Sequence, residues 1–317
     1  MNSANFISVI ITAYDRKDYL RMAVDSVRNQ TLNKMFFEII VVKNFEDRYV
    51  DNIKEKNFTS VNMEGSIGEY ISIGIEKSRG NIICFLDDDD EFYPNKIQEV
   101  YDAFETHIQL GYYHNSFRVI DKEGKQLKNR FGYKQPKREL YISKQVKEKY
   151  LFKLAKHHGT FNASCVAVRR STIFTQIPYL KNISASTDGA LYIIALRSNS
   201  DILVTPKVLN KYRVHGNQTR PLTKGKWSAV NKKMLEATTS FSDFLKGTRF
   251  EKYGNSNKFY WLIKCKISEE RPDITWGNVL DSFRYFVLTS WTSFFSITVI
   301  LMVLKVFRIS PIDIHYK

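Results

Sequence analysis

The chain has few cysteines, glycines and prolines, and these shortages exclude several classes of protein. Its three cysteines, Cys84, Cys165 and Cys265, are too few and too scattered for a disulfide framework or a zinc site. With only 14 glycines and 7 prolines it also lacks low-complexity linkers, and it shows no internal repeat. The opening residues, MNSANF, lack the basic start and apolar core of a signal peptide. Because Cys84 and Cys165 lie in apolar runs, we interpret them as buried thiols of a protein in a reducing, cytoplasmic compartment.

Acidic residues are also in short supply relative to basic ones. The chain has 48 Lys and Arg against 33 Asp and Glu, a formal net charge of +15. Such a charge indicates an anionic partner, namely nucleic acid, a phosphorylated substrate or an anionic membrane surface, although a solvated basic surface is the alternative. The lysine-rich stretches at 122–156 and 205–233 do not resemble a nucleic-acid-binding module, so we expect no nucleic-acid partner. The 43% hydrophobic content is ample for a core.

Short apolar runs alternate with amphipathic segments over the first 110 residues. We expect strands at 6–14, 36–44, 58–62 and 81–86, and helices at 15–31, 67–80 and 93–107. This alternation predicts β-α-β units and therefore an α/β fold with a mostly parallel sheet flanked by helices. In such sheets ligands bind beyond the carboxyl ends of the strands.

The pattern changes after residue 110. We expect a hairpin at 112–127 turning at Glu123-Gly124, a strand at 162–170, a helix at 186–199, two short strands within 201–217 broken near Pro206, and helices over 226–264. The segment 286–304 contains no charged residue, with thirteen apolar and six Ser or Thr residues. Nineteen helical residues nearly match a bilayer core of about 30 Å. A helix lying on or packed in a membrane, a true span, and a soluble helix packed in a core or an oligomer all remain open for it.

An acidic run, DDDDE at 87–91, stands out against this basic chain. Adjacent carboxylates after a buried strand repel one another unless a cation offsets the repulsion. Mg²⁺ and Mn²⁺ prefer oxygen ligands and are often held by one or two carboxylates together with substrate phosphates. The run therefore predicts a site for a divalent metal and a diphosphate, with a solvated acidic turn as the alternative. We assign no role to Asp90 and Glu91 and expect both to be solvated flanking residues.

An ordered set of motifs makes the function more specific. It consists of SVIITAYDRKDYLRMAVDSVRNQT, EIIVV, GEYISIGIEKSRGNIICFLDDDDEFYP, NASCVAVRRSTIF, TDGALYIIALRSN and YRVHGNQTR. The set resembles family-two glycosyltransferases with the Rossmann-like GT-A fold, over residues of about 6–220. The chain departs from the family at Lys43-Asn44, where an acidic pair usually follows the second strand, and at Tyr70-Ile71-Ser72, where Ala-Arg-Asn is common.

The resemblance implies roles for particular residues. Asp188 matches the catalytic base, with a helix N-cap beside Thr187 as the structural alternative. The metal, Mn²⁺ or Mg²⁺, would be held by Asp89, Asp87 and His215. The nucleotide sugar, a UDP- or GDP-sugar, would be bound by Thr12, Ala13, Tyr14, Asp15, Asn44, Asp87 and Asp88.

The resemblance also implies the organisation of the chain. Residues 1–110 would bind the nucleotide sugar and 111–220 would form the acceptor-binding, catalytic half of the same domain. Beyond the resemblance, the helical pattern and the apolar segment at 286–304 lead us to expect a helical, membrane-associating region at 221–317. The predicted enzyme transfers a sugar with inversion to a glycan or a polyprenyl-phosphate-linked acceptor, at the cytoplasmic face of the cell membrane. A single displacement of this kind needs a base for the acceptor hydroxyl and an electrophile for the departing diphosphate.

Four other interpretations fit parts of the sequence. A haloacid-dehalogenase-like phosphatase would carry Asp-x-Asp on its first strand, whereas here the run follows a later one. A sugar nucleotidylyltransferase needs a glycine-rich loop after the first strand, where this chain has TAYDRKDYL. A protein that binds nucleic acid through its charge alone is the third, and a non-catalytic, membrane-associated scaffold that kept the fold is the fourth.

Overall fold

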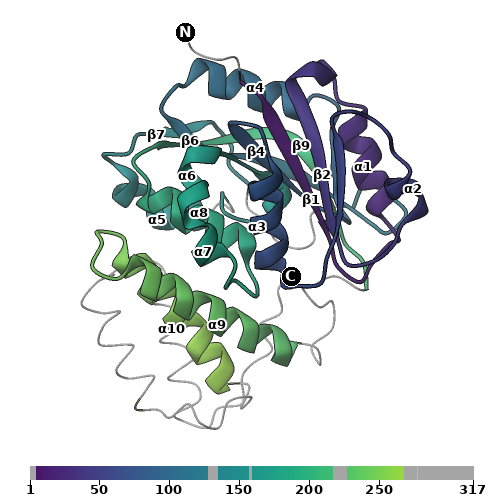
Figure 1. Cartoon of the computed structure of the whole chain (residues 1–317). Helices are drawn as coiled ribbons and strands as arrows, with labels where there is room; N and C mark the ends of the chain where they lie inside the picture. Colours follow the sequence, from purple (N-terminus) through teal and green to yellow (C-terminus); the bar gives the residue numbers. More distant parts are fainter. Residues whose placement is uncertain (1–4, 128–134, 157–158, 217–226, 268–276, 278–317) are drawn as a thin grey trace. The chain divides into compact units, whose positions relative to one another are not determined.

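The computed structural model describes residues 5–127, 135–156, 159–216, 227–267 and 277 (Figure 1). The chain divides into two compact units. One comprises Met1–Asn129 and Tyr133–His215, and the other comprises Arg130–Gly132 and Gly216–Lys317.

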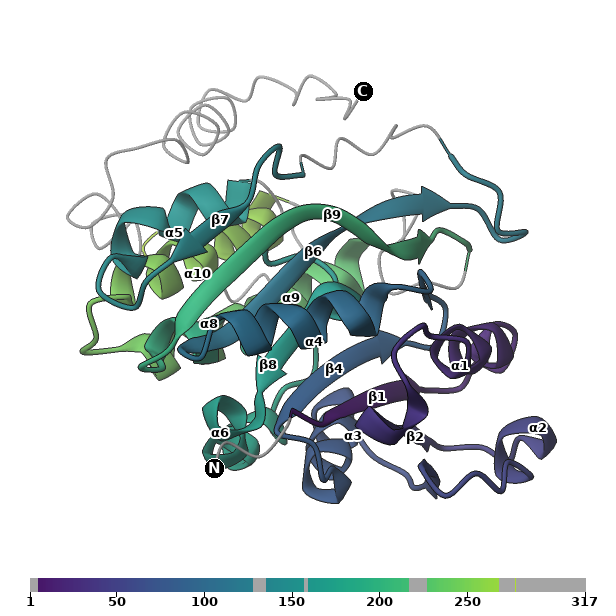
Figure 2. The same cartoon turned by 90° about the horizontal axis from the view of Figure 1, so that it is seen from above.

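A single sheet forms the centre of the first unit. Its strands are β1 (Ile7–Ala13), β2 (Phe37–Lys43), β3 (Phe58–Asn62), β4 (Ile82–Asp87), β5 (Glu91–Phe92), β6 (Leu110–Ile120), β7 (Leu140–Ile142), β8 (Val166–Arg169) and β9 (Asp201–Arg213). The strand order is β3-β2-β1-β4-β8-β6-β9-β5, and β7 also pairs with β9. Strands β1 to β4 lie at one end of the sheet, and β6, β7 and β9 lie at the other (Figure 2).

The predicted parallel sheet is confirmed for its first half only. Strands β3, β2, β1 and β4 are mutually parallel, as the β-α-β pattern predicts. Beyond β4 the sheet is mixed, because β8 runs antiparallel to both of its neighbours, β4 and β6. The chain thus has a mixed α/β fold.

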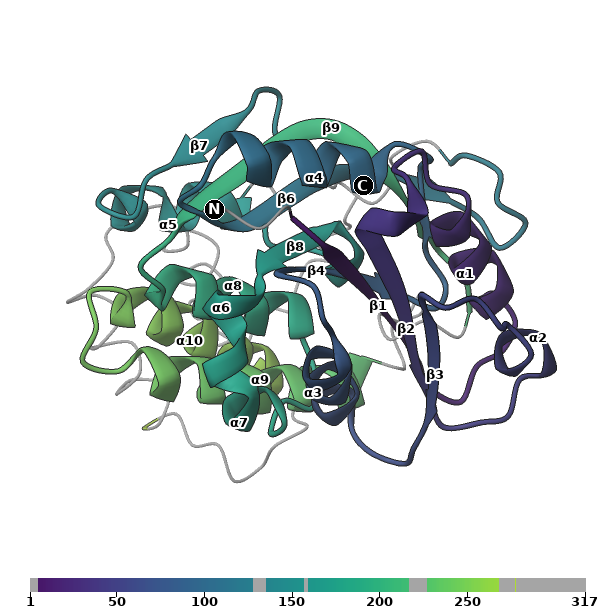
Figure 3. The ribbon, with the colours of Figure 1, turned by 45° about the horizontal axis from the view of Figure 1, so that its top comes forward.

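Helices cover both faces of the sheet. They are α1 (Leu20–Arg28), α2 (Arg48–Asp51), α3 (Ile67–Lys77), α4 (Lys96–Thr106), α5 (Lys147–Lys156), α6 (Arg170–Ile173), α7 (Ile177–Leu180) and α8 (Thr187–Arg197), with short 3₁₀ turns at Lys34–Phe36, Ala163–Cys165 and Phe174–Gln176. Helices α1 and α4 lie on one face, and α3, α6 and α8 lie on the other (Figure 3).

Local sequence explains the close fit of the first-half helices. Four apolar residues of α1, Leu20, Ala23, Val24 and Val27, are buried, and they pack on alternate residues of β1. Helix α3 begins with a capping box in which Ser66 and Glu69 each bond the other's backbone N–H. A Cβ at Gly74 would lie 2.5 Å from the side chain of Ile10, so glycine is what allows α3 to approach β1 this closely.

The register of the parallel strands brings three carboxyl ends to one edge. Ala13 of β1 lies opposite Lys43 of β2, and Thr12 lies opposite Asp87 of β4. The residues that follow these strands therefore meet at this edge, as the sequence predicts.

The second half differs from the prediction in two places. Instead of two strands broken near Pro206, β9 is one strand that pairs in parallel with β6. Pro206 is tolerated because the register jumps from His114↔Val204 to Ser116↔Val208, which places the proline in a bulge. The expected turn at Gly124 is present, with a φ of 86°, but the hairpin is reduced to one bridge in the part of the chain that the structure describes.

The second unit contains two helices among its described residues, α9 (Trp227–Leu245) and α10 (Glu251–Ile267), in the region predicted to be helical. They pack closely, since a Cβ at Gly254 would lie 2.8 Å from the Cα of Ser242. No helix within the described ranges is both long and apolar enough to cross a membrane. The apolar segment at 286–304 lies outside the described residues.

Candidate active site

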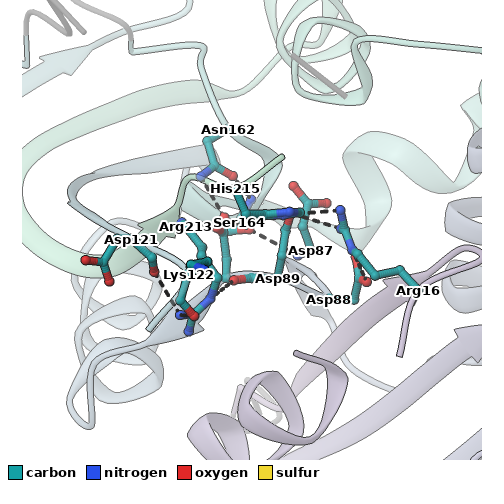
Figure 4. Close-up of polar contacts among 11 residues, drawn as sticks. Arg16, Asp87, Asp88, Asp89, Asp121, Lys122, Asn162, Ser164, Arg213 and His215 are labelled. Atoms are coloured by element: carbon teal, nitrogen blue, oxygen red, sulfur yellow. Dashed lines mark hydrogen bonds and ion pairs between the residues drawn. The ribbon is translucent and has the colours of Figure 1, made fainter. Parts of the chain in front are cut away.

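The acidic run forms a tight turn at the carboxyl edge of the sheet. Asp87 ends β4, and its carbonyl accepts a hydrogen bond of 3.1 Å from the backbone N–H of Asp90. The next residue, Glu91, pairs in β5 with Lys211 of β9. Because β9 is tied to the run in this way, the residues that end β9 reach the acidic turn from a distant part of the chain (Figure 4).

Two cationic or polar side chains converge on the middle of the run. Arg16, just after β1, donates to Asp88 at 2.8 Å and pairs with Asp89 at 2.9 Å. His215 Nε2 lies 2.9 Å from the same Oδ2 atom of Asp89. Burial raises the pKa of Asp88 to about 6, and the hydrogen bond from Arg16 opposes this shift. The structure thus brings together Asp88, Asp89 and His215, three of the residues predicted to bind metal or nucleotide.

The donor set at this edge fits a hard divalent cation. Asp87, Asp89 and Asp90 each offer a carboxylate oxygen, and these oxygens lie within 4.8 Å of one another. Burial and the neighbouring carboxylates raise the pKa of Asp87 well above its usual range, and burial, followed by the charge of Asp89, raises that of Asp90 to about 7. A divalent cation would relieve this repulsion, and oxygen ligands suit Mg²⁺ or Mn²⁺.

The expectation that Asp90 and Glu91 are solvated flanking residues is wrong. Asp90 is only 1% exposed, and it accepts hydrogen bonds from Asn162 Nδ2 at 2.8 Å, Ser164 Oγ at 2.7 Å and the backbone of Arg213 at 3.0 Å. Glu91 pairs with Lys211 at 2.8 Å and with Arg213. The partners of Asp90 lie more than 70 residues away in sequence, so no local pattern marks it as buried.

Arg213 lies in the motif YRVHGNQTR and is a supporting residue to which the sequence assigned no role. Its side chain is fully buried, and its Nε donates to the carbonyl of Asp89 at 2.9 Å. A second guanidinium nitrogen donates to the carbonyls of Asp121 and Lys122, both at 3.1 Å, and the guanidinium lies over the ring of Tyr19 at 4.6 Å. Arg213 therefore fixes the backbone of the acidic run against the turn after β6 (Figure 4).

The predicted base, Asp188, lies in the first turn of α8 and is not its N-cap, which is Ser186. Its carboxylate accepts hydrogen bonds from the backbone of Asn162 at 2.9 Å, the backbone of Gly189 at 2.8 Å and Ser186 Oγ at 3.2 Å. Burial raises the pKa of Asp188, and these hydrogen bonds oppose the shift. A carboxylate with a raised pKa is a suitable proton acceptor near neutral pH.

Lys43 and Asn44, which stand where the family usually has an acidic pair, both make polar contacts within the protein. Lys43 is fully buried at its side chain and pairs with Asp51 at 2.9 Å. Asn44 and Asp15 bond reciprocally, with Asn44 Oδ1 accepting from the Asp15 backbone at 2.9 Å and Asn44 Nδ2 donating to Asp15 Oδ1 at 2.7 Å. These bonds hold Asp15 at a φ of 52°. Beside them Tyr14 is 54% exposed, which leaves an aromatic ring available at this edge.

This arrangement agrees with the comparison of the chain with known families. A sequence model of glycosyl transferase family 2 matches residues 8–177, which span β1 through the start of α7 and include the whole acidic run. The chain belongs to glycosyl transferase family 2.

Curated relatives with glycosyltransferase names agree with this membership. The chain is 24% identical over 266 residues to an uncharacterized glycosyltransferase of Methanocaldococcus jannaschii, MJ1057, covering 81% of this chain and 84% of that protein. It is 30% identical over 139 residues to the minor teichoic acid biosynthesis protein GgaA of Bacillus subtilis, covering 39% of this chain and 31% of GgaA.

Among solved structures, TarS 1-349 of S. aureus in complex with UDP-GlcNAc is similar to this family 2 chain with a TM-score of 0.58. The identity is 13%, and the match covers 82% of this chain and 72% of that one. At this identity the likeness shows the fold alone, which is that of the GT-A glycosyltransferases.

Proposed function

We propose that the chain is an inverting glycosyltransferase that moves a sugar from a nucleotide diphosphate to a glycan or lipid-linked acceptor. In this reaction the bond from the anomeric carbon to the acceptor oxygen forms as its bond to the diphosphate breaks. The observation that carries the proposal is the carboxylate cluster of Asp87, Asp89 and Asp90 at the carboxyl edge of the sheet of a family 2 chain.

Asp188 is the proposed base. It takes the proton of the attacking acceptor hydroxyl, while the electron pair of the breaking bond leaves with the diphosphate. Its three hydrogen-bond donors fix the orientation of the carboxylate, and burial raises its pKa. Both properties favour proton transfer at neutral pH.

Asp87 and Asp89 are the proposed ligands of Mn²⁺ or Mg²⁺, with His215 beside them. When bound, the metal would supply positive charge to the departing diphosphate. Asp90 supports the proposed ligands through its three buried hydrogen bonds, since it holds the acidic turn onto the strand that ends at Arg213.

The carboxyl end of β1 is the proposed nucleoside site. Tyr14 offers a ring for base stacking, and the pair of Asp15 and Asn44 offers polar atoms at the end of β1. Thr12, Ala13 and Asp88 complete this proposed site. Because TarS was solved with UDP and with UDP-GlcNAc, UDP-sugars are the donors to test first.

Two observations support the proposed acceptor, namely the net charge of this chain and the name of a relative. A chain of net charge +15 attracts polyanions and anionic membrane surfaces. GgaA carries the name of a teichoic acid biosynthesis protein, so a teichoic acid is a suitable first acceptor. We further propose that the apolar segment at 286–304 holds the enzyme at the cytoplasmic face of the membrane, near a carrier such as a polyprenyl phosphate. Deletion of residues 280–317, followed by membrane fractionation, tests this step.

A thermal-shift panel with UDP-, GDP-, CDP- and dTDP-sugars, each with and without Mn²⁺, tests the donor. The expected result is stabilisation by one nucleotide class that increases with Mn²⁺, because a ligand that binds only the folded state stabilises it. No stabilisation by any nucleotide would overturn the proposal.

The Asp188→Asn variant tests the base. We expect a loss of about 10²- to 10⁴-fold in kcat with nucleotide binding unchanged, since the amide keeps the size of the side chain and removes the proton acceptor. Asp102→Asn, on the exposed surface of α4, is the matched control. Full activity of Asp188→Asn would refute the assignment. If wild-type protein binds donor but transfers and hydrolyses nothing, the chain is instead a binding protein that kept the fold.

A further inference from the structure

Asn162 lies between the acidic run and the proposed base and contacts both. Its side-chain Nδ2 donates to Asp90 Oδ2 at 2.8 Å, and its backbone N–H donates to Asp188 Oδ2 at 2.9 Å. Its Oδ1 accepts from the backbone of Ser164 at 2.8 Å. With 5% of its surface exposed, Asn162 is a buried, direct link between the two carboxylates.

The backbone of Asn162 adopts a conformation that L-residues rarely take. Its φ is 74°, and only three non-glycine residues in the described ranges have a positive φ: Asp15, Asn162 and Ser186. Two of these three, Asn162 and Ser186, are hydrogen-bond donors to Asp188. Such conformations persist only where the surroundings hold them, and here the side-chain bonds of Asn162 aim its N–H at the base.

Both carboxylates have hydrogen-bond donors other than Asn162. Asp90 is also held by Ser164 and by the strand end at Arg213, and Ser164 Oγ in turn accepts from the backbone of Asp87 at 3.1 Å. Asp188 is otherwise held by its own helix start, through Ser186 and Gly189. Loss of the Asn162 side chain would therefore leave Asp90 held by Ser164 and Arg213, and Asp188 held by its own helix start, while removing the direct bond from Asn162 to the acidic run.

A chain of buried hydrogen bonds holds Ser164, which lies two residues after Asn162. The carbonyl of Ser164 accepts from Asn210 Nδ2 at 2.7 Å, and Asn210 Oδ1 accepts from Asn115 Nδ2 at 2.7 Å. Lys96 donates to Asn115 at the end of this chain of contacts. All four side chains are buried, so the network holds the segment after Asn162 in one position.

We propose that Asn162 is a positioning residue that sets the proposed base at a fixed distance and angle from the donor held by the acidic run. The inference rests on the proposed function. A single displacement needs the base, the acceptor oxygen and the anomeric carbon in line, and a misplacement of about 1 Å is enough to cost roughly 10²-fold in rate. The role of Asn162 is therefore in transfer rather than in donor binding.

Two substitutions at Asn162 separate its side chain from its backbone. Asn162→Gly removes the bond to Asp90 but keeps the N–H and tolerates the positive φ, whereas Asn162→Asp keeps the size and replaces the donor with a second carboxylate. Asn182→Gly is the matched control, because Asn182 is exposed and its side chain bonds only the local carbonyl of Pro178.

The assay uses UDP-GlcNAc with Mn²⁺ and compares transfer to teichoic acid with hydrolysis by water, alongside UDP binding. We expect transfer by Asn162→Gly to fall about 10- to 100-fold, as for other residues that orient a catalytic group, with the UDP Kd changed by no more than about twofold. The ratio of transfer to hydrolysis should fall as well, and Asn162→Asp should transfer no faster than Asn162→Gly. Asn182→Gly should match wild type in every measurement.

Three results would overturn the inference. Wild-type transfer by Asn162→Gly would show that the link is not needed. An equal fall of transfer and hydrolysis, with a matching loss of UDP-binding stoichiometry, would show that Asn162 only maintains the fold. If the wild-type chain binds none of the nucleotide sugars of the thermal-shift panel and releases no sugar from them, the proposed function fails first, and the inference fails with it.

Discussion

Replacement of Arg213 by methionine should strongly destabilise the first unit. The substitution keeps most of the buried volume but removes the charge pair with Glu91 and the donors to the carbonyls of Asp89, Asp121 and Lys122. Breaking a buried charge pair from one side costs about 3–5 kcal/mol. Glu91 keeps its bond to Lys211, which places the expected loss near about 3 kcal/mol, the lower end of that range.

In a unit of this size each kcal/mol shifts the midpoint of thermal unfolding by roughly 2–4 °C, so we expect a decrease of roughly 6–12 °C. All four tryptophans lie at position 227 or beyond, so tryptophan fluorescence reports on the second unit. The unfolding of the first unit should be followed by circular dichroism, with fluorescence as the internal reference.

Two further variants define the effect at Arg213. Arg118→Met, at an exposed site on β6, should change the unfolding free energy by no more than about 0.5 kcal/mol. Arg213→Lys should fall between wild type and Arg213→Met, because an ammonium keeps the charge but cannot reach all the carbonyls of the guanidinium fork. If Arg213→Met unfolds at the same temperature as Arg118→Met, the reasoning from these contacts is refuted.

Two other predictions follow from the described contacts. Burial lowers the pKa of Lys96 from 10.5 to about 8, so the unfolded state binds more protons between these values and stability should rise with pH there, at about 1 kcal/mol per pH unit. Urea unfolding from pH 8 to pH 10 measures this slope, which Lys96→Met should abolish; an unchanged slope in that variant would contradict the assignment. Asp89→Asn should lose the Mn²⁺-dependent part of the stabilisation by UDP in a thermal-shift assay, whereas the exposed control Glu123→Gln should retain it, and retention by both would exclude Asp89 as a ligand.

The sequence was informative where local pattern and topology determine the structure. Strands β1 and β2 each have seven consecutive buried residues, five of them apolar, so both are recognisable as apolar runs. Four apolar residues of α1 fall on one helical face and are buried. Parallel pairing then places the ends of these strands at one edge, so the position of Asp87 follows from the fold class. The resemblance to a known family added the identity of the candidate base, which periodicity alone would have assigned to a helix cap.

The sequence was uninformative where long-range contacts determine the environment of a residue. Asp90 and Asp89 are adjacent and chemically identical, yet only Asp90 bonds Asn162 and Ser164. These bonds span 72 and 74 residues of sequence, and they depend on how β8 joins the sheet. Likewise, Pro206 predicts a strand break, and the sequence does not reveal the register shift after His114 that accommodates the proline.

The departure at Lys43-Asn44 leaves polar side chains at the edge of the sheet where the family's acidic pair would lie. Lys43 is directed to Asp51, so its charge is neutralised within the β2 side of the sheet. Asn44 bonds Asp15, which follows β1. The carboxylate of Asp15 therefore lies at the same edge of the sheet as the end of β2, which the family's acid would follow. Because the two strand ends are adjacent and the Asn44 amide fixes one oxygen of Asp15, this edge still carries one carboxylate and one amide. A carboxylate supplied by the neighbouring strand can meet a base edge as well as one supplied by β2, since recognition depends on the position of the atoms and not on the strand that carries them.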